Sequence, residues 1–105
     1  VCGSDIIGYR IMQLLLQAGI KVPGDVSITG FDAQPKPFGL PQLASVKHPA
    51  VHIGAAALRM VLERQRMPDA LPRSLTFNGV IVKGESVARP VDKFETRTIT
   101  IEVPV

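Results

Sequence analysis

The chain has 105 residues, a formal net charge of +3 and a hydrophobic content of 46%. This length allows one domain with one core, and a charged fraction of 20% excludes a disordered or fibrous chain. No apolar run approaches the ~20 residues that cross a bilayer, so we expect a soluble protein with no membrane partner. The basic residues are scattered, which argues against a nucleic-acid-binding surface on this chain. The single cysteine, Cys2, excludes an internal disulfide framework and is typical of a reducing compartment.

The chain begins with Val1 rather than methionine, and residues 1–3 look like the end of a strand. We therefore expect a piece of a longer protein or a processed chain. Ser4 or Asp5 can cap a helix over residues 5–18, which Gly19 ends at a position that favours glycine. Residues 26–30 then predict a short buried strand, and the proline-rich residues 31–42 predict an ordered irregular loop.

The second half of the chain repeats this alternation of strands and helices. Residues 43–47 predict a strand, and Pro49 opens a helix that runs to residue 66, since proline suits the first helical position. A turn with prolines leads to two further predicted strands, over residues 74–77 and 80–83. Strand–helix–strand spacing of this kind is typical of a βαβ unit with parallel strands. The sequence therefore predicts an α/β fold with a largely parallel sheet and flanking helices.

Polar residues follow two of the predicted strands. Ser4 and Asp5 come after the first strand, and Asp32 follows the strand at 26–30. Because neighbouring parallel strands end at the same edge of a sheet, these side chains should meet where open α/β folds bind ligands. The Asp32 carboxylate can accept two hydroxyl hydrogen bonds, which suits the vicinal hydroxyls of a sugar or nucleoside. Asp32, Ser4 and Asp5 are thus predicted ligand contacts, although each can serve only as a turn or helix cap.

The first helix is apolar over roughly 220° of its circumference, about twice what one-sided packing on a sheet requires. We assign the surplus to Tyr9, Met12 and Leu16, and we expect it to meet a second copy of the chain, together with Phe38 and Leu40 from the loop. The alternative is that a missing part of the same chain covers this face.

The sequence carries no recognisable catalytic or metal-binding set. Ser4, Asp32 and His48 occur in the order of a hydrolase triad, but the required G-x-S-x-G turn is absent. His48 and His52 have the spacing of metal ligands on a helix, but His48 precedes the helix and no third ligand is near in sequence. No nucleotide-binding fingerprint is present. We expect no enzyme activity, no metal and no cofactor.

Four motifs in order resemble the LacI/GalR family of bacterial repressors. Residues 2–8 read C-G-S-D-I-I-G, and residues 18–32 read A-G-I-K-V-P-G-D-V-S-I-T-G-F-D. Residues 41–46 read P-Q-L-A-S-V, and residues 80–86 read V-I-V-K-G-E-S. The second run is similar to the family signature G-x-x-V-P-x-D-v-S-v-x-G-F-D nearly position by position. Two departures are Ser4 in place of the family's asparagine and Gly84 in place of its arginine.

The resemblance implies the C-terminal subdomain of a periplasmic-binding-protein-like fold, formed by residues 1–90, with residues 91–105 as an extension and possible extra strand. It implies a cytoplasmic transcriptional regulator that binds a small effector, such as a sugar or nucleoside-like molecule, next to Asp32 and Ser4. It also implies a homodimer through the helix at 5–18, which favours Tyr9 and Met12 as contacts, and DNA binding only through an N-terminal part that precedes this chain. The alternative is a periplasmic sugar-binding protein of an ABC transporter, which shares the fold.

Overall fold

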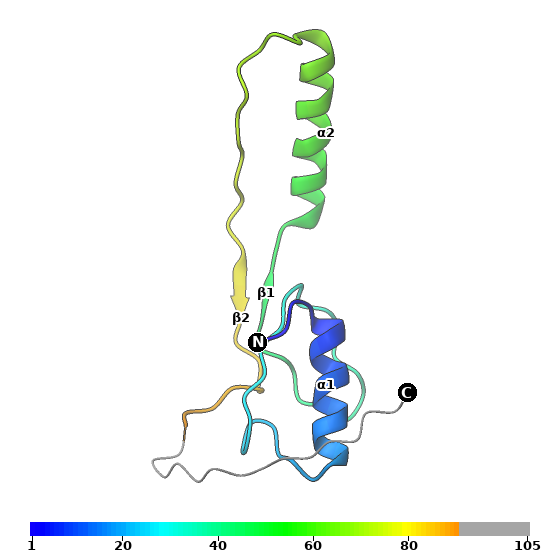
Figure 1. The fold of residues 1–105 in the computed structure, drawn as a ribbon, viewed down its shortest axis with the longest axis vertical. Helices are drawn as coiled ribbons and strands as arrows, with labels where there is room; N and C mark the ends of the chain where they lie inside the picture. The colour runs from blue at the N-terminus through cyan, green and yellow to red at the C-terminus, as the bar shows by residue number, and fades with distance from the viewer. Residues whose placement is uncertain (91–105) are drawn as a thin grey trace. The chain divides into compact units, whose positions relative to one another are not determined.

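The computed structural model describes residues 1–90, so the extra strand predicted within residues 91–105 lies outside the described part. The elements follow the order α1 (Asp5–Gln17), β1 (Ser45–Lys47), α2 (Ala50–Arg66) and β2 (Val80–Val82) (Figure 1). The chain divides into two compact units. One contains Val1–Lys47 and the residues from Ile81 onward, and the other is His48–Val80.

Helix α1 forms where the sequence predicts it, with both of its ends capped. The side-chain oxygen of Ser4 accepts a hydrogen bond from the backbone N–H of Ile7 at 3.4 Å, which satisfies one of the free donors of the first turn. Gly19 follows the last turn with φ +78°, a conformation that glycine adopts without steric cost. The two caps fix the helix at its predicted length, to within one residue.

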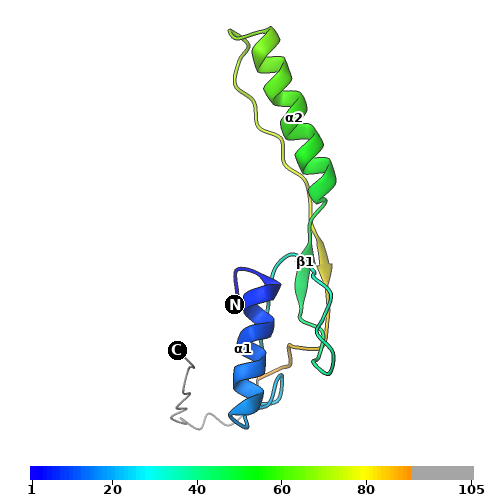
Figure 2. The same cartoon turned by 90° about the vertical axis from the view of Figure 1, so that its right-hand side faces the viewer.

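The core of the first unit lies between α1 and the segments that follow it (Figure 2). Six apolar side chains are buried there: Tyr9, Met12, Leu15, Ile20, Ile28 and Leu43. Cys2 is half-buried against this cluster, as expected of a residue in a strand end. A Cβ atom on Gly8 would lie 2.7 Å from Cδ1 of Leu43, so the small residue allows the helix to approach the strand segment closely.

Three extended segments run in the same direction beside one another. Residues 29 and 44 form a parallel bridge, and the N–H groups of Gly30 and Asp32 donate to the carbonyls of Ala44 and Val46 at 2.8 and 3.0 Å. Both residue numbers advance by two, as parallel pairing requires. On the other side, the N–H of Cys2 donates to the carbonyl of Thr29 at 2.8 Å. The predicted strand at 26–30 is therefore reduced to a single bridge, and the strand predicted at 43–47 is reduced to β1.

The two regular strands, β1 and β2, pair with each other in one small sheet. The N–H of Glu85 donates to the carbonyl of Gln42 at 2.7 Å, while residues 45–47 pair with residues 80–82, so residue numbers fall on one segment as they rise on the other. The chain accordingly runs out through β1 and back through β2 (Figure 1). This pair is antiparallel, next to segments that pair in parallel.

The second unit consists of α2 and the extended segment that follows it. The guanidinium of Arg64 donates to the carbonyl of Ala70 at 2.8 Å, and Arg73 forms an ion pair with Glu63. No residue of α2 is buried. The strand predicted at residues 74–77 is wrong, because the structure assigns no strand pairing to these residues and they are exposed.

Candidate functional site

The ends of the first two extended segments meet at one edge, as the sequence predicts. The backbone N–H of Asp5 donates to the carbonyl of Phe31 at 2.9 Å, which joins the first turn of α1 to the start of the loop at 31–42. Ser4, Asp5 and Asp32 therefore come from adjacent segments, at the carboxyl ends where open α/β folds bind ligands.

Asp32 begins a turn with an unusual backbone. Its φ is 104°, and that of Ala33 is 54°, so two consecutive residues with side chains occupy the left-handed region. The N–H of Asp32 is held by the carbonyl of Val46. The residue is partly exposed, which leaves part of its surface at the edge where the predicted ligand would sit.

Asp5 lies inside the protein rather than on its surface. Its side chain is 0% exposed, and its two carboxylate oxygens accept hydrogen bonds from the Ser45 hydroxyl at 2.8 Å and from the N–H of Gln34 at 2.7 Å. Asp5 has no exposed surface, so the direct ligand contact that the sequence predicts requires the side chain to be uncovered first. Ser4 caps α1 with its hydroxyl and is only partly buried, so a ligand contact at this residue stays a prediction.

Sequence reasoning did not single out Ser45, Gln34 or Gly30, which complete this edge. Ser45 is 4% exposed, and its hydroxyl both donates to Asp5 and accepts from the N–H of Ala33 at 2.9 Å. A Cβ atom on Gly30 would lie 2.2 Å from Oδ1 of Asp5, so only glycine leaves room for the carboxylate. The available signal for Ser45 was a hydroxyl within an apolar predicted strand. Its partner, Asp5, is 40 residues away in the sequence, so no local pattern joins the two.

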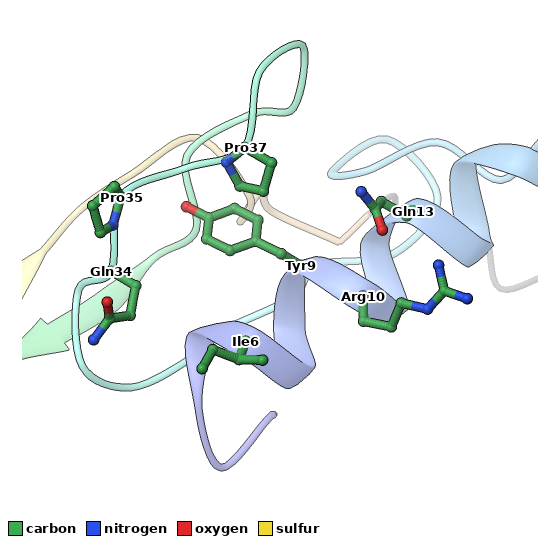
Figure 3. A pocket seen from close by; sticks show the side chains of 7 residues that line it. All are labelled: Ile6, Tyr9, Arg10, Gln13, Gln34, Pro35 and Pro37. Atoms are coloured by element: carbon green, nitrogen blue, oxygen red, sulfur yellow. The ribbon is translucent and has the colours of Figure 1, made fainter.

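An open pocket of about 330 Å³ lies between α1 and the loop at 31–42. Its lining combines apolar side chains with polar ones, namely Ile6, Tyr9, Arg10, Gln13, Gln34, Pro35 and Pro37. Figure 3 shows the Tyr9 ring extending from α1 toward the two prolines, and the Arg10 guanidinium pointing away from them. The Tyr9 hydroxyl accepts from the N–H of Leu43 at 3.1 Å and from Nε2 of Gln42 at 3.0 Å. The ring is thus fixed between the core and the pocket.

The structure corrects the predicted outward face of α1. Met12 is 0% exposed and Tyr9 is 5% exposed, because the side of the helix that carries them packs onto the core. Leu16, the third predicted contact on α1, is exposed, and so are Ile6, Ile7 and Ile11, which were not assigned to this face. Of the other predicted dimer contacts, Phe38 is fully exposed at the tip of the loop, and Leu40 is partly buried against the core.

Among residues 1–90, no group of three or more His, Cys, Asp or Glu side chains could hold a metal ion. In the same residues, no helix has the length and apolar character needed to span a bilayer.

Comparisons with known proteins agree with one another on the kind of protein that this chain resembles. A family profile described as the periplasmic binding protein-like domain matches residues 1–87. The chain is 33% identical over 95 residues to the HTH-type transcriptional regulator MalR of Streptomyces coelicolor, covering 89% of this chain and 28% of that protein. It is 30% identical over 87 residues to the ribose operon repressor of Haemophilus influenzae, covering 82% of this chain and 26% of that protein.

A solved structure agrees with these relatives. The crystal structure of a LacI family transcriptional regulator from Silicibacter pomeroyi matches with a TM-score of 0.59 at 27% identity, covering 83% of this chain and 27% of that chain. The chain therefore belongs to the periplasmic binding protein-like domain family. Within that family its relatives are LacI-type transcriptional regulators, and it spans about a quarter of their length.

Proposed function

We propose that this chain is the effector-binding and dimerisation part of a LacI-type bacterial transcriptional regulator, with residues 1–90 forming most of one subdomain. The observation that carries the proposal is the similarity to such regulators over 82–89% of the chain. The same relatives favour a regulator over a transporter's sugar-binding protein. In this proposal the protein is cytoplasmic and catalyses no reaction, its intact sheet is largely parallel, and DNA is bound by a part of the regulator outside this chain.

The proposed effector is a sugar or nucleoside-like molecule that contacts Asp32 at the edge. A carboxylate at this position can accept hydrogen bonds from two neighbouring hydroxyl groups, each worth about 1.5–3 kcal/mol when one partner is charged. Ser4 lies on the adjacent segment, which supports a second contact there. Binding that favours one arrangement of the regulator would change its affinity for DNA, with a coupling of typically about 1–3 kcal/mol.

Asp32→Ala in the full-length regulator should abolish the response to effector and leave DNA binding intact. We expect affinity to fall at least ~100-fold, as the loss of two charge-assisted hydrogen bonds implies. Calorimetry with D-ribose, D-glucose, maltose and adenosine measures the affinity, and a DNA fragment from upstream of the gene measures DNA binding. Asp32→Asn is the matched variant, because asparagine tolerates a positive φ. If both variants bind effector with the affinity of the wild type, Asp32 only stabilises the turn and does not contact the effector.

The second part of the proposal is a homodimer formed through α1 and the loop at 31–42. Its support is the apolar surface there, which includes Ile6 beside the pocket and the fully exposed Phe38. A soluble chain seldom leaves so much apolar surface uncovered. The alternative is that part of the same polypeptide, and not a second copy, covers this apolar surface.

Phe38→Ser should weaken the dimer of the full-length regulator at least tenfold. Burial of a phenylalanine side chain stabilises by about 1.5–3 kcal/mol, and a two-fold symmetric contact contains it twice. Sedimentation equilibrium measures the dissociation constant. Leu71→Ser is the control, because Leu71 is an apolar side chain with 88% exposure in the other unit. A wild-type protein that sediments as a monomer, or an equal loss in both variants, would contradict this interface.

A further inference from the structure

The turn that carries Asp32 needs an external restraint. The positive φ values of Asp32 and Ala33 are disfavoured for residues with a Cβ atom, and two in succession are less favourable still. Asp32 has a side chain that tolerates this region, but Ala33 does not. Interactions outside the turn must therefore hold it in this conformation.

The restraint in this structure is a buried carboxylate–hydroxyl pair. The N–H of Ala33 donates to Oγ of Ser45 at 2.9 Å, and the next N–H, of Gln34, donates to Oδ2 of Asp5 at 2.7 Å. The Ser45 hydroxyl in turn donates to Oδ1 of Asp5 at 2.8 Å. Two consecutive backbone donors of the turn are thus captured by two side chains that also bind each other.

The pair is itself held rigidly. Asp5 is 0% exposed and Ser45 is 4% exposed, so water does not compete for their hydrogen bonds. Gly30 lies directly against the carboxylate, where any larger residue would displace it. Asp5 belongs to the first turn of α1 and Ser45 to β1, so both are fixed by regular structure. The two acceptor oxygens, on Ser45 and Asp5, therefore have fixed positions, and the backbone of the turn adopts the conformation that lets its N–H groups reach them.

We propose that Asp5 and Ser45 are positioning residues of the ligand site, which hold the Asp32–Ala33 turn in its left-handed conformation and so direct the Asp32 carboxylate toward the effector. This inference rests on the proposed function, in which Asp32 contacts the effector. It gives Asp5 a different role from the direct contact expected from the sequence. It also makes Ser45, which the sequence did not predict as a ligand contact, a contributor to effector affinity.

The test removes the Ser45 hydroxyl and then restores the conformation of the turn with a glycine at position 33. In the full-length regulator, Ser45→Ala should raise amide hydrogen exchange at Ala33 and Gln34 at least ~10-fold and weaken effector binding about tenfold, as expected for a lost buried hydrogen bond. Ser45→Thr keeps the hydroxyl and should behave like the wild type. Adding Ala33→Gly to Ser45→Ala should recover affinity, because glycine adopts a positive φ unaided.

The measurements are hydrogen exchange by mass spectrometry and calorimetry with D-ribose, D-glucose, maltose and adenosine. Ser27→Ala is the control: its hydroxyl also accepts an N–H at 3.1 Å, but from Ala88, which is not part of the turn, and on an exposed surface. If Ser45→Ala does not fold, the isosteric Asp5→Asn replaces it, since it leaves one acceptor oxygen for two donors. Faster exchange at Gln34 or Ala33 in that variant then supports the proposal.

The outcomes separate this inference from the function on which it rests. Unchanged exchange in Ser45→Ala overturns the positioning role, whatever Asp32 does. Equal loss of affinity in Ser45→Ala and Ser45→Thr also overturns it, because the hydroxyl is then not the cause. If Asp32→Ala binds effector normally while exchange responds as expected, the restraint on the turn stands and the proposed ligand site fails.

Discussion

Replacing Gly84 with alanine should destabilise the protein by about 3 kcal/mol or more. A Cβ atom at this position would lie 2.5 Å from the carbonyl carbon and oxygen of Leu43 and 2.6 Å from the backbone nitrogen of Ala44. All three are backbone atoms of a paired segment, so they cannot move aside as a flexible side chain would. The φ of +60° adds a second cost, because a Cβ atom is disfavoured there.

Gly39→Ala separates the cost of a positive φ from the cost of steric overlap with the backbone. Gly39 has φ +80°, but a Cβ atom there would meet nothing within 4 Å. We expect Gly39→Ala to lower the free energy of unfolding by only about 1–2 kcal/mol, which is the cost of a left-handed conformation for a residue with a side chain. Urea unfolding followed by circular dichroism gives both values. Equal destabilisation in the two variants would show that the close approach at Gly84 is relieved by a backbone shift.

This packing gives a structural consequence to one departure from the family pattern. The LacI-type closing motif has arginine where this chain has Gly84, and the sequence alone assigns no consequence to the change. In the structure the position has no space for any side chain, because the chain passes directly over residues 43 and 44. Restoring the family residue by Gly84→Arg should therefore be at least as destabilising as the alanine.

Ser86→Ala should cost about 2–3 kcal/mol, since it leaves a buried donor and a buried acceptor unsatisfied. Ser86 is 0% exposed, and its hydroxyl accepts from the N–H of Ala44 at 2.8 Å and donates to the carbonyl of Ile28. One hydroxyl thus joins three segments of the first unit. The same urea titration measures the effect.

Ser27→Ala is a matched control for this variant. The Ser27 hydroxyl also pairs with one N–H and one carbonyl, both of Ala88, but it does so on an exposed surface where water can replace it. We expect a change within about 0.5 kcal/mol, as for most surface substitutions. If Ser86→Ala is as mild as Ser27→Ala, the three segments are held together by packing and not by the shared hydroxyl.

Local signals predicted the helices well and the strands poorly. Caps and glycines determined α1, because Ser4 and Gly19 act within a few residues of the ends that they set. Strands depend on a partner that the sequence does not reveal. Residues 74–77 have a strand-like composition, but the described chain offers them no neighbour, so Leu75 remains 59% exposed. Residues 26–30 find neighbours, but they form only one bridge.

The sequence predicted which residues meet at this edge of the fold, but not which side chain turns inward. Strand order placed Asp5 and Asp32 at one edge, which the structure confirms. Which side chain turns inward depends on contacts with Gly30 and Ser45, both distant in sequence from Asp5, and no local pattern predicts them. The helical wheel failed for Met12 for a similar reason. A wide apolar arc does not indicate which part of it faces the core.

Helix α1 is attached to the neighbouring extended segment at two points, through Asp5 to Ser45 and through Tyr9 to Leu43. Four residues of helix advance about 6 Å along its axis, and two residues of strand advance about 6.6 Å. The two spacings are therefore commensurate, and the helix fits the strand in a single register. Sliding α1 along its axis must break both attachments together. Any displacement of α1 along its axis that keeps these two hydrogen bonds must therefore carry residues 43–45 with it.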